Sequence, residues 1–248
     1  MTHAPAGGTG TRRVRKVLTT RRGGFSASPF DSFNLGDHVG DDPAAVAANR
    51  RRLAEGMGLD PADFVWMEQI HSNTVTVVDG RHDEPVPATD AIVTAVPGLA
   101  LVVLVADCVP VLLSDEDAGI VAAVHAGRIG ARNGIVARTV GKMVELGATP
   151  GGIHALLGAA AGGDRYEVPD EMAADVEKHL PGSRTRTRQG TSGVDVRAGL
   201  MRQLHGLGVT HINAEPRCTI SEPDYFSYRR DGRTGRQAGV VVLGETPA

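Results

Sequence analysis

LALVVLVADCVPVLL, residues 99–113, consists of two apolar runs separated by a short break that contains a cysteine. The first run, residues 99–105, is the longest apolar stretch of the chain, and the second covers residues 109–113. Short runs rich in Val and Leu are typical of buried strands, and both are far shorter than the ~20 residues that cross a membrane. The segment therefore predicts two buried strands with Cys108 at the break between them.

Strand-like runs of the same kind recur on both sides of this segment, and helical patterns lie between them. Further strands are expected at residues 73–78, 91–95, 119–124 and 238–243, and helices at about 43–57, 132–145, 169–180 and 194–207. The first helix has a carboxylate cap at Asp42, Pro43 in its first turn and Gly58 as a stop. This alternation predicts an α/β (α+β) protein. No linker or low-complexity stretch divides the 248 residues, which favours a single domain.

The charge of the chain is nearly balanced, with a formal net charge of −3. This balance argues against a general nucleic-acid binder. Residues 1–16 are basic without any acid, and we expect them to form a flexible N-terminal tail that leads into a first strand. The first residues lack the apolar segment of a signal peptide, and Cys108 and Cys218 lie in different contexts. We therefore expect a reduced, cytoplasmic protein without a membrane partner.

His71, Cys108 and His125 each lie at the edge of an apolar run and carry side chains that bind metals. Zn²⁺ accepts a thiolate with two imidazoles, and three protein ligands leave a position open for water or substrate. The neighbouring Asp107 would point to the opposite face of an extended strand, so we expect it to accept hydrogen bonds rather than bind metal. Because the gaps between the three residues are long, a buried thiol with two hydrogen-bonded histidines stays open as an alternative.

A connection punctuated by glycine, Ala126-Gly127-Arg128-Ile129-Gly130, follows the third of these residues. It joins a predicted strand to a predicted helix, so its backbone N–H groups could face an anion such as phosphate. It is neither a Walker loop nor a full dinucleotide fingerprint, and glycine after a strand also serves ordinary turns. Both interpretations stay open at this point.

Several segments gain meaning when they are considered together and in order. They are Thr20-Arg21-Arg22-Gly23-Gly24, residues 33–43 (FNLGDHVGDDP), Gln69-Ile70-His71, Ala106-Asp107-Cys108-Val109-Pro110 and Val124-His125-Ala126-Gly127, followed by Cys218-Thr219, residues 226–232 (FSYRRDG) and residues 234–239 (TGRQAG). In this order they closely resemble the YfiH/YlmD laccase-domain family, also called multicopper polyphenol oxidoreductases or peptidoglycan editing factors. The resemblance extends from about residue 17 to residue 243.

The resemblance implies one catalytic domain over residues 17–245, a four-layer α/β/β/α sandwich related to the cysteine-hydrolase domain of a bacterial toxin. It implies that His71, Cys108 and His125 are catalytic and bind a metal, with Zn²⁺ favoured over Cu²⁺. The implied chemistry is phosphorolysis of adenosine, inosine, guanosine and methylthioadenosine, together with hydrolytic deamination of adenosine. The expected partners are a purine nucleoside and phosphate, and the expected assembly is a monomer or a small homo-oligomer.

Four further residues are expected to contact substrate. Asn34 and His38 resemble substrate-facing positions of the family, although an Asx turn and an exposed imidazole explain them equally. Arg128 belongs to the glycine-punctuated connection, and Arg229 belongs to the Tyr228-Arg229-Arg230 cluster.

Two segments depart from the family pattern. Members usually have His-Ala-Gly-Trp-Arg-Gly after the third ligand, whereas this chain has Arg128 and Ile129 in place of the tryptophan and arginine. Their Gly-Pro-Cys-Cys-Tyr-Glu-Val segment is GGDRYEV here, at residues 162–168. These departures bear on substrate recognition, because a lost Trp removes a surface for stacking.

Three alternative functions remain open from the sequence. Cys108 could be the nucleophile of a metal-independent hydrolase acting on peptidoglycan precursors, with His125 or His71 as the base. The chain could also be a diverged, inactive homologue that only binds a partner. Copper-dependent phenol oxidation is disfavoured, because multicopper chemistry needs several clustered sites and this chain has only nine scattered histidines.

Overall fold

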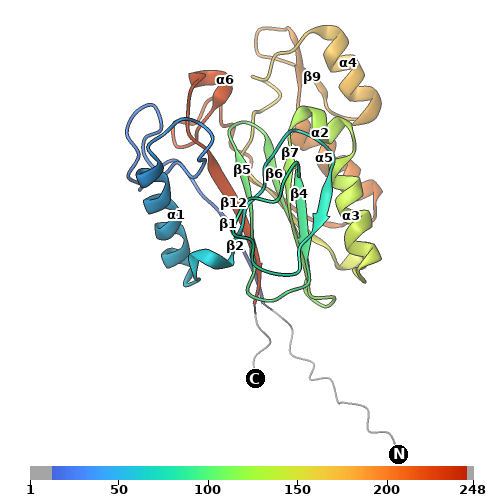
Figure 1. Ribbon diagram of the computed structural model, residues 1–248. Helices are drawn as coiled ribbons and strands as arrows, with labels where there is room; N and C mark the ends of the chain where they lie inside the picture. Colours follow the sequence, from blue (N-terminus) through green and yellow to red (C-terminus); the bar gives the residue numbers. More distant parts are fainter. Residues whose placement is uncertain (1–12, 245–248) are drawn as a thin grey trace, which may run out of the picture.

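A six-stranded sheet and a four-stranded sheet dominate the computed structural model, which describes residues 13–244 (Figure 1). The six-stranded sheet has the order β11-β8-β6-β7-β4-β3, and its strands are β3 (Val75–Val77), β4 (Ala91–Thr94), β6 (Val109–Asp115), β7 (Ile120–Ala126), β8 (His154–Leu157) and β11 (His211–Ala214). The four-stranded sheet has the order β1-β12-β5-β2, with β1 (Val14–Leu18), β2 (Phe64–Val65), β5 (Ala100–Val105) and β12 (Gln237–Leu243). A separate ribbon pairs β9 (Arg184–Arg186) with β10 (Ser192–Val194).

Six α-helices and two short 3-10 helices are present among the described residues. They are α1 (Pro43–Met57), α2 (Arg128–Arg132), α3 (Ile135–Glu145), α4 (Asp170–His179), α5 (Val196–Gly206), α6 (Tyr228–Asp231), and the 3-10 helices Pro61–Asp63 and Pro150–Gly152. The predicted ends of α1 are confirmed: the Asp42 side chain accepts a hydrogen bond from the Ala44 backbone, and Gly58 adopts the left-handed conformation that ends the helix.

Alternation along the buried strands divides the core into separate clusters. In β5, Ala100, Val102 and Leu104 pack in a cluster with Leu53 and Met57 of α1. The side chains between them, Leu101, Val103 and Val105, pack against residues of the six-stranded sheet such as Leu112 and Val121. Successive side chains of a strand point to opposite faces, so a strand covered on both faces is apolar throughout. This is why residues 99–105 form one continuous apolar run.

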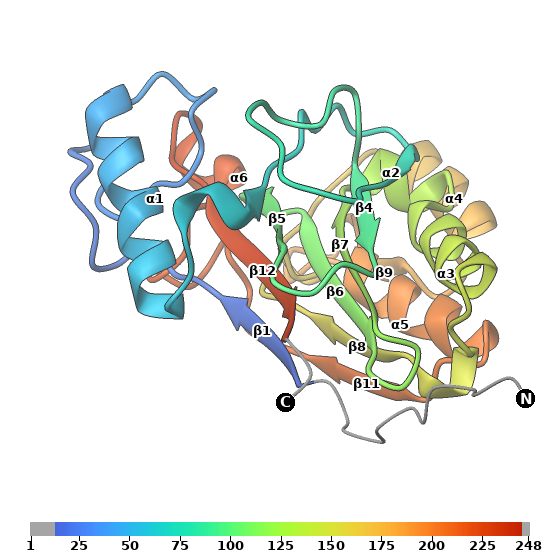
Figure 2. The same ribbon diagram turned by 60° about the horizontal axis from the view of Figure 1, so that its bottom comes forward.

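The helices lie on the outer sides of the two sheets, as Figure 2 shows, with α1 on one side and α3, α4 and α5 on the other. The outward face of β7 carries Ile120, Ala122 and Val124, which pack in the cluster that also includes Ile135 of α3 and Leu200 of α5. The mixed α/β class expected from the sequence is therefore confirmed. The strands predicted at residues 73–78, 91–95, 99–105, 109–113, 119–124 and 238–243 are all present, with small shifts of their ends.

The boundary predicted for the basic tail needs a correction. Residues 14–16 were placed in a flexible segment, yet they belong to β1 and pair with residues 241–243 of β12. Val14 and Leu18 pack against the cluster between the sheets, which anchors this strand. Residues 1–12 of the predicted tail lie outside the described part of the chain, as do residues 245–248.

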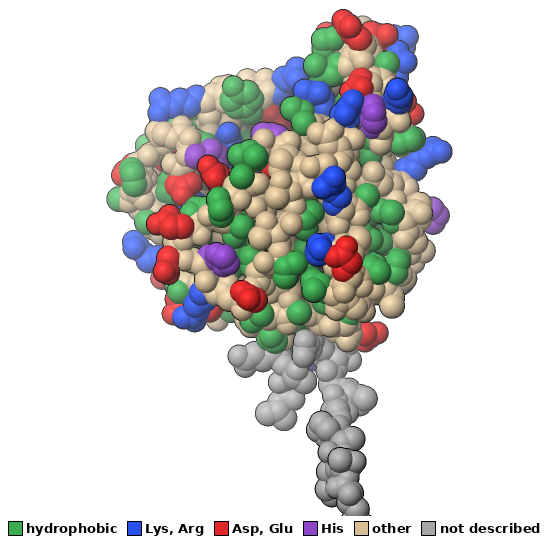
Figure 3. All heavy atoms as spheres, turned by 45° about the vertical axis from the view of Figure 1, so that its right-hand side comes forward, with side chains coloured by type: hydrophobic (Ala, Val, Ile, Leu, Met, Phe, Trp, Pro, Cys, Tyr) green, Lys and Arg blue, Asp and Glu red, His purple; other side chains and the backbone are tan. Residues whose placement is uncertain are grey.

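Charged side chains of both signs are interspersed on the face shown in Figure 3. The projection at the top of that view includes the α4 region, where Asp170 pairs with Arg184 of β9. Among the helices of residues 13–244, none has the length and apolar character needed to cross a membrane.

Candidate metal centre and its cavity

The three metal-binding residues expected from the sequence converge at one end of the sheets. His71 lies in the loop between β2 and β3, Cys108 in the turn between β5 and β6, and His125 near the end of β7. One ligand atom from each lies within 4.8 Å of the others. The two imidazole rings meet edge to face, with their centroids 4.7 Å apart. This arrangement of one sulfur and two nitrogen donors could hold a metal ion.

Asp90, which sequence analysis did not select, fixes two of these residues. Its fully buried carboxylate lies 2.8 Å from Nδ1 of His125 and accepts hydrogen bonds from the backbone N–H groups of His71 and Ser72 at 3.0 and 2.6 Å. Burial raises the pKa of Asp90, but the hydrogen bonds from His125 and Ser72 outweigh burial and lower it to about 2. A charged carboxylate on Nδ1 leaves Nε2 of His125 for Cys108 or a metal.

Gly127 allows the ligands to approach one another. A Cβ atom at this position would lie 2.7 Å from Nδ1 of His71, which is closer than real Cβ atoms come, and 3.0 Å from Sγ of Cys108, which is tighter than most Cβ contacts. The backbone of Gly127 itself is extended, with φ of −70°. The glycine after the third ligand is therefore needed for space against the site, not for turn geometry.

The break in the apolar segment is a turn rather than a continued strand. Asp107 has a φ of 86°, so the expectation that its side chain opposes Cys108 on an extended strand is wrong. Its predicted role as a hydrogen-bond acceptor is confirmed: Thr219 Oγ1 donates to one carboxylate oxygen at 2.6 Å, and the backbone N–H of Arg229 donates to the other at 2.7 Å. Asp107 thus joins the turn to the segment that carries α6.

The charge state of the site follows from its burial and its neighbours. Burial raises the pKa of the Cys108 thiol, but the charges and hydrogen bonds of His125 and His71 outweigh burial and lower it to about 6. Burial lowers the pKa of His125, but the Cys108 thiolate and the Asp90 hydrogen bond raise it to about 9. Near neutral pH the metal-free site therefore holds a thiolate beside an imidazolium.

A cavity of about 440 Å³ opens beside the three ligands. Its volume falls in the range of ~300–1000 Å³ that is common for small-molecule sites. Besides the ligands, its lining consists mainly of apolar strand residues, two tyrosines, Tyr166 and Tyr228, and three arginines, Arg128, Arg229 and Arg236. Asp107 is the only carboxylate among the described residues that line it. The cavity therefore combines apolar and aromatic surface with an excess of positive charge.

Three of the four predicted substrate residues line this cavity, namely His38, Arg128 and Arg229. Arg128 does so although it replaces the usual tryptophan, and Ile129 points outward with 45% of its surface exposed. Asn34 is placed differently, because its side chain is fully buried and does not line the cavity. Its Oδ1 atom accepts from the backbone N–H groups of Gly36 and Arg236. Its prediction as a direct substrate contact is corrected accordingly, since protein groups occupy its amide.

The second departure from the family pattern also has a defined place. Asp164 forms an ion pair with Arg188, and two residues later Tyr166 lines the cavity. The guanidinium of Arg229 lies over the Tyr166 ring, 4.8 Å from its centroid, and donates to the carbonyl of Glu167 at 3.1 Å. An aromatic surface is therefore present in the cavity even though the usual tryptophan is absent.

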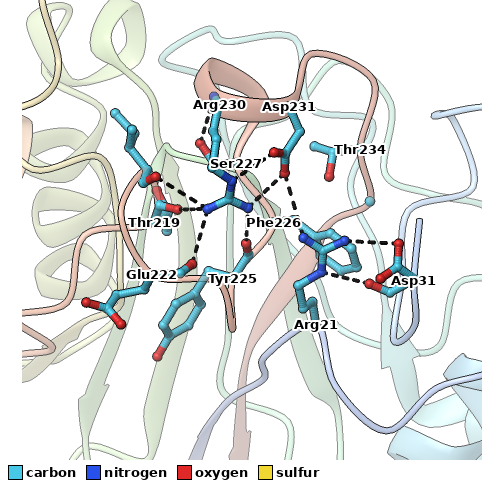
Figure 4. Close-up of polar contacts among 12 residues, drawn as sticks. Arg21, Asp31, Thr219, Glu222, Tyr225, Phe226, Ser227, Arg230, Asp231 and Thr234 are labelled. Atoms are coloured by element: carbon cyan, nitrogen blue, oxygen red, sulfur yellow. Dashed lines mark hydrogen bonds and ion pairs between the residues drawn. The ribbon is translucent and has the colours of Figure 1, made fainter. Parts of the chain in front are cut away.

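The segment that carries α6 and Arg236 is held by a network of arginines, shown in Figure 4. Arg230 donates to the backbone carbonyls of Thr219 and Tyr225, each at 2.8 Å, and pairs with Asp231 at 2.8 Å. Arg21 lies between Asp31 and Asp231, at 3.2 and 3.7 Å. A side chain that satisfies several carbonyls at once fixes the course of an irregular segment. The network therefore holds the part of the chain that delivers Tyr228, Arg229 and Arg236 to the cavity.

Four features of the site were not predicted from the sequence: the roles of Asp90, Tyr166 and Arg236, and the space that Gly127 provides. Asp90 directly precedes the predicted strand at 91–95, but no spacing links it to His71 or His125. Arg236 belongs to the segment TGRQAG that contributed to the family resemblance, so that segment was the available signal.

Comparisons with known proteins agree with the fold and identify related sequences. A family model described as "Multi-copper polyphenol oxidoreductase laccase" matches residues 15–244. The purine nucleoside phosphorylase of Corynebacterium glutamicum is 68% identical over 234 residues, which cover 94% of this chain and 95% of that protein. The crystal structure of YlmD from Geobacillus stearothermophilus has a TM-score of 0.88 at 34% identity and covers 94% and 92% of the two chains. The hypothetical protein YfiH of Bacillus licheniformis has a TM-score of 0.86 at 32% identity, with 93% and 92% covered.

Proposed function

The chain belongs to the multi-copper polyphenol oxidoreductase laccase family, and we propose that it is a purine nucleoside phosphorylase with a zinc ion at its His-Cys-His cluster. The relative from Corynebacterium glutamicum, similar over nearly the whole chain, is named a purine nucleoside phosphorylase. The observation that carries the proposal is the convergence of His71, Cys108 and His125 at the wall of a cavity rich in arginine and tyrosine. The substrates would be adenosine, inosine, guanosine and methylthioadenosine.

The donor set favours zinc at this site. One thiolate and two imidazoles match the ligands of catalytic zinc sites that keep a fourth position open. The lowered pKa of Cys108 provides the thiolate without a metal, and Asp90 orients the imidazole of His125 toward the site. When bound, the zinc ion would supply a Lewis acid that polarises a purine atom.

The residues around the cavity fit the demands of phosphorolysis. Breaking the bond between a purine and ribose develops positive charge on the sugar, and phosphate must be held nearby as the nucleophile. Arginine side chains suit the phosphate, since their charge-assisted hydrogen bonds are strong. Tyr166 and Tyr228 offer aromatic surface against which the purine can stack. Apolar residues such as Leu104 and Val196 limit water in the cavity.

The proposal is tested by measuring metal content and product formation on the same samples. The variants His71→Ala and Cys108→Ala should lose near-stoichiometric zinc and the formation of ribose 1-phosphate from inosine and phosphate. Cys218→Ala is the matched control, because its thiol accepts a hydrogen bond from the Gly162 backbone and does not line the cavity. Zinc without product in the unmodified protein would instead favour a diverged homologue that only binds a partner.

Deamination of adenosine, which the family resemblance also implies, stays a prediction. It requires water to attack C6 of the purine ring with release of ammonia, whereas phosphorolysis requires phosphate to attack C1′ of the ribose. Inosine formed from adenosine in phosphate-free buffer would support it. The absence of inosine in that buffer, with protein that forms ribose 1-phosphate once phosphate is added, would contradict it.

A second candidate function is supported by the order Asp90, His125, Cys108. A carboxylate on one nitrogen of an imidazole, with a thiolate on its other side, is the arrangement of a cysteine hydrolase. The three core clusters also suit the four-layer α/β/β/α sandwich that the resemblance implies, and the relation to a toxin hydrolase domain stays a prediction. Rapid alkylation of Cys108 by iodoacetamide without a chelator would favour this hydrolase. Protection until chelation would favour zinc.

Copper-dependent phenol oxidation is not favoured. Among residues 13–244, His71, Cys108 and His125 form the one group of three or more convergent His, Cys, Asp and Glu side chains. Multicopper oxidation needs several such sites in one cluster.

A further inference from the structure

We propose that Arg236 is the anchor for the phosphate co-substrate, and that the loop Asn34-Leu35-Gly36 holds it in place. This inference rests on the proposed phosphorolysis for the identity of the anion. It gives a role to Arg236, which was not predicted from the sequence, and to Asn34, whose predicted contact with substrate the structure does not support.

The backbone and the stem of Arg236 are fixed from several sides. Its N–H donates to Oδ1 of Asn34 at 2.8 Å, and its carbonyl accepts from the Leu35 N–H at 3.1 Å. A Cβ atom on Gly36 would lie 2.8 Å from Cγ of Arg236, so this stem packs directly on the glycine. The loop between β1 and α1 therefore positions a side chain that β12 brings to the cavity.

The guanidinium is fixed at one edge and available at the other. Nη1 donates to the carbonyls of Thr234 and Gly235, each at 3.0 Å. Among the hydrogen bonds and ion pairs of residues 13–244, none involves Nε or Nη2 of Arg236. The edge formed by these two atoms is left for the cavity that Arg236 lines. Two parallel N–H groups on one edge are the donors that bind two oxygens of a phosphate at once.

The other charged groups of the cavity favour Arg236 over its neighbours. Arg229 is engaged with Glu167 and Tyr166, and no hydrogen bond fixes the guanidinium of Arg128 among the described residues. Asp107 is the one carboxylate among the described lining residues, and it forms no ion pair with Arg236. Burial lowers the pKa of the Arg236 guanidinium, and the charges of Cys108 and Asp107 offset part of this effect. A fixed cation that lacks a carboxylate partner is prepared for an anionic ligand and loses little conformational freedom when it binds.

The step that Arg236 would assist is simple. One oxygen of the phosphate forms a bond to C1′ of the ribose while the bond from C1′ to the purine nitrogen breaks. The electron pair of that bond leaves with the purine, which takes up a proton from solvent, and the products are the free base and ribose 1-phosphate. Arg236 would hold the other phosphate oxygens and orient the attacking one.

Steady-state kinetics of the full-length, metal-loaded protein test the inference. Arg236→Gln should raise the KM for phosphate by about 10- to 100-fold, as expected for a lost charge-assisted pair of hydrogen bonds, and change the KM for inosine by less than about threefold. Arg236→Lys keeps the charge but not the paired donors and should lie between. Gly36→Ala should raise the KM for phosphate in the same direction, because it displaces the Arg236 stem. Arg233→Gln is the matched control, since it removes the same charge from the same segment outside the cavity.

A binding measurement separates this inference from the proposed function. Calorimetric titration of inorganic phosphate into the metal-loaded protein should show saturable binding to the unmodified chain that is lost in Arg236→Gln and kept in Arg233→Gln. If the unmodified protein forms no ribose 1-phosphate but binds phosphate through Arg236, the phosphorylase proposal fails and the anion site stands. Equal phosphate binding in both variants, no binding to the unmodified chain, or an effect of Arg236→Gln on inosine alone would overturn the inference.

Discussion

Replacing Gly127 with alanine should weaken metal binding while the fold stays intact. The new Cβ would lie 2.7 Å from Nδ1 of His71, whereas ordinary van der Waals contact begins at 3.4 Å. The His71 ring must therefore move by about 0.7 Å, and Cys108 by a few tenths of an ångström. Metal–ligand bonds tolerate deviations of only about 0.2 Å. The backbone angles of Gly127 are ones that alanine adopts, and the exposed side chain of His71 can rotate away from the new Cβ. The substitution should therefore reduce the free energy of metal binding rather than that of folding.

We expect zinc affinity to fall by at least 10- to 100-fold, which is about 1.4–2.8 kcal/mol. Competition with a chromophoric chelator measures the affinity, and thermal unfolding of the metal-free protein measures the fold. Gly141→Ala is the matched control. Gly141 lies in α3, its added Cβ would meet no atom within 4 Å, and a helix interior favours alanine over glycine by about 1 kcal/mol. Unchanged zinc affinity in Gly127→Ala would refute the steric role assigned to this glycine, and so would a loss of affinity as large in Gly141→Ala.

Three further predictions follow from the site. In chelator-treated protein, iodoacetamide should alkylate Cys108 at half its maximal rate near pH 6, because only the thiolate reacts and it is protonated below that pH. A rate that rises only near pH ~8.5, the usual pKa of a cysteine thiol, would contradict the lowered pKa. Asp90→Asn should weaken zinc binding about 10- to 100-fold and lower the free energy of unfolding, measured by urea titration, by about 1–3 kcal/mol. The control Asp164→Asn breaks a surface ion pair and should change the free energy of unfolding by less than about 1 kcal/mol. Tyr166→Ala should raise the KM for inosine about 2- to 10-fold with little change in zinc content, and an unchanged KM would exclude stacking on this ring.

Periodicity in the sequence predicted the buried strands and the capped helix because both are local properties. Residues 99–105 are apolar throughout, since β5 is covered on both faces, and Asp42, Pro43 and Gly58 mark the ends of α1 by their own hydrogen bonds and backbone angles. The strands β8 to β11 were missed for the same reason. They are only three or four residues long, each contains exposed or half-buried residues, and β11 lies at the edge of its sheet, so their patterns resemble those of loops.

The sequence by itself determined which residue types could bind a metal, namely the histidines and the cysteine at the ends of apolar runs. Their spacing could not show that His71, Cys108 and His125 meet, because spacing along a chain does not encode distance between strands; the family resemblance implied this meeting, and the tertiary structure brings it about. The tertiary structure alone decided that Asp90 fixes two of them, and that Asn34 faces Arg236 rather than a substrate. Each of these contacts joins segments that are remote in sequence, and the packing of the two sheets brings those segments together.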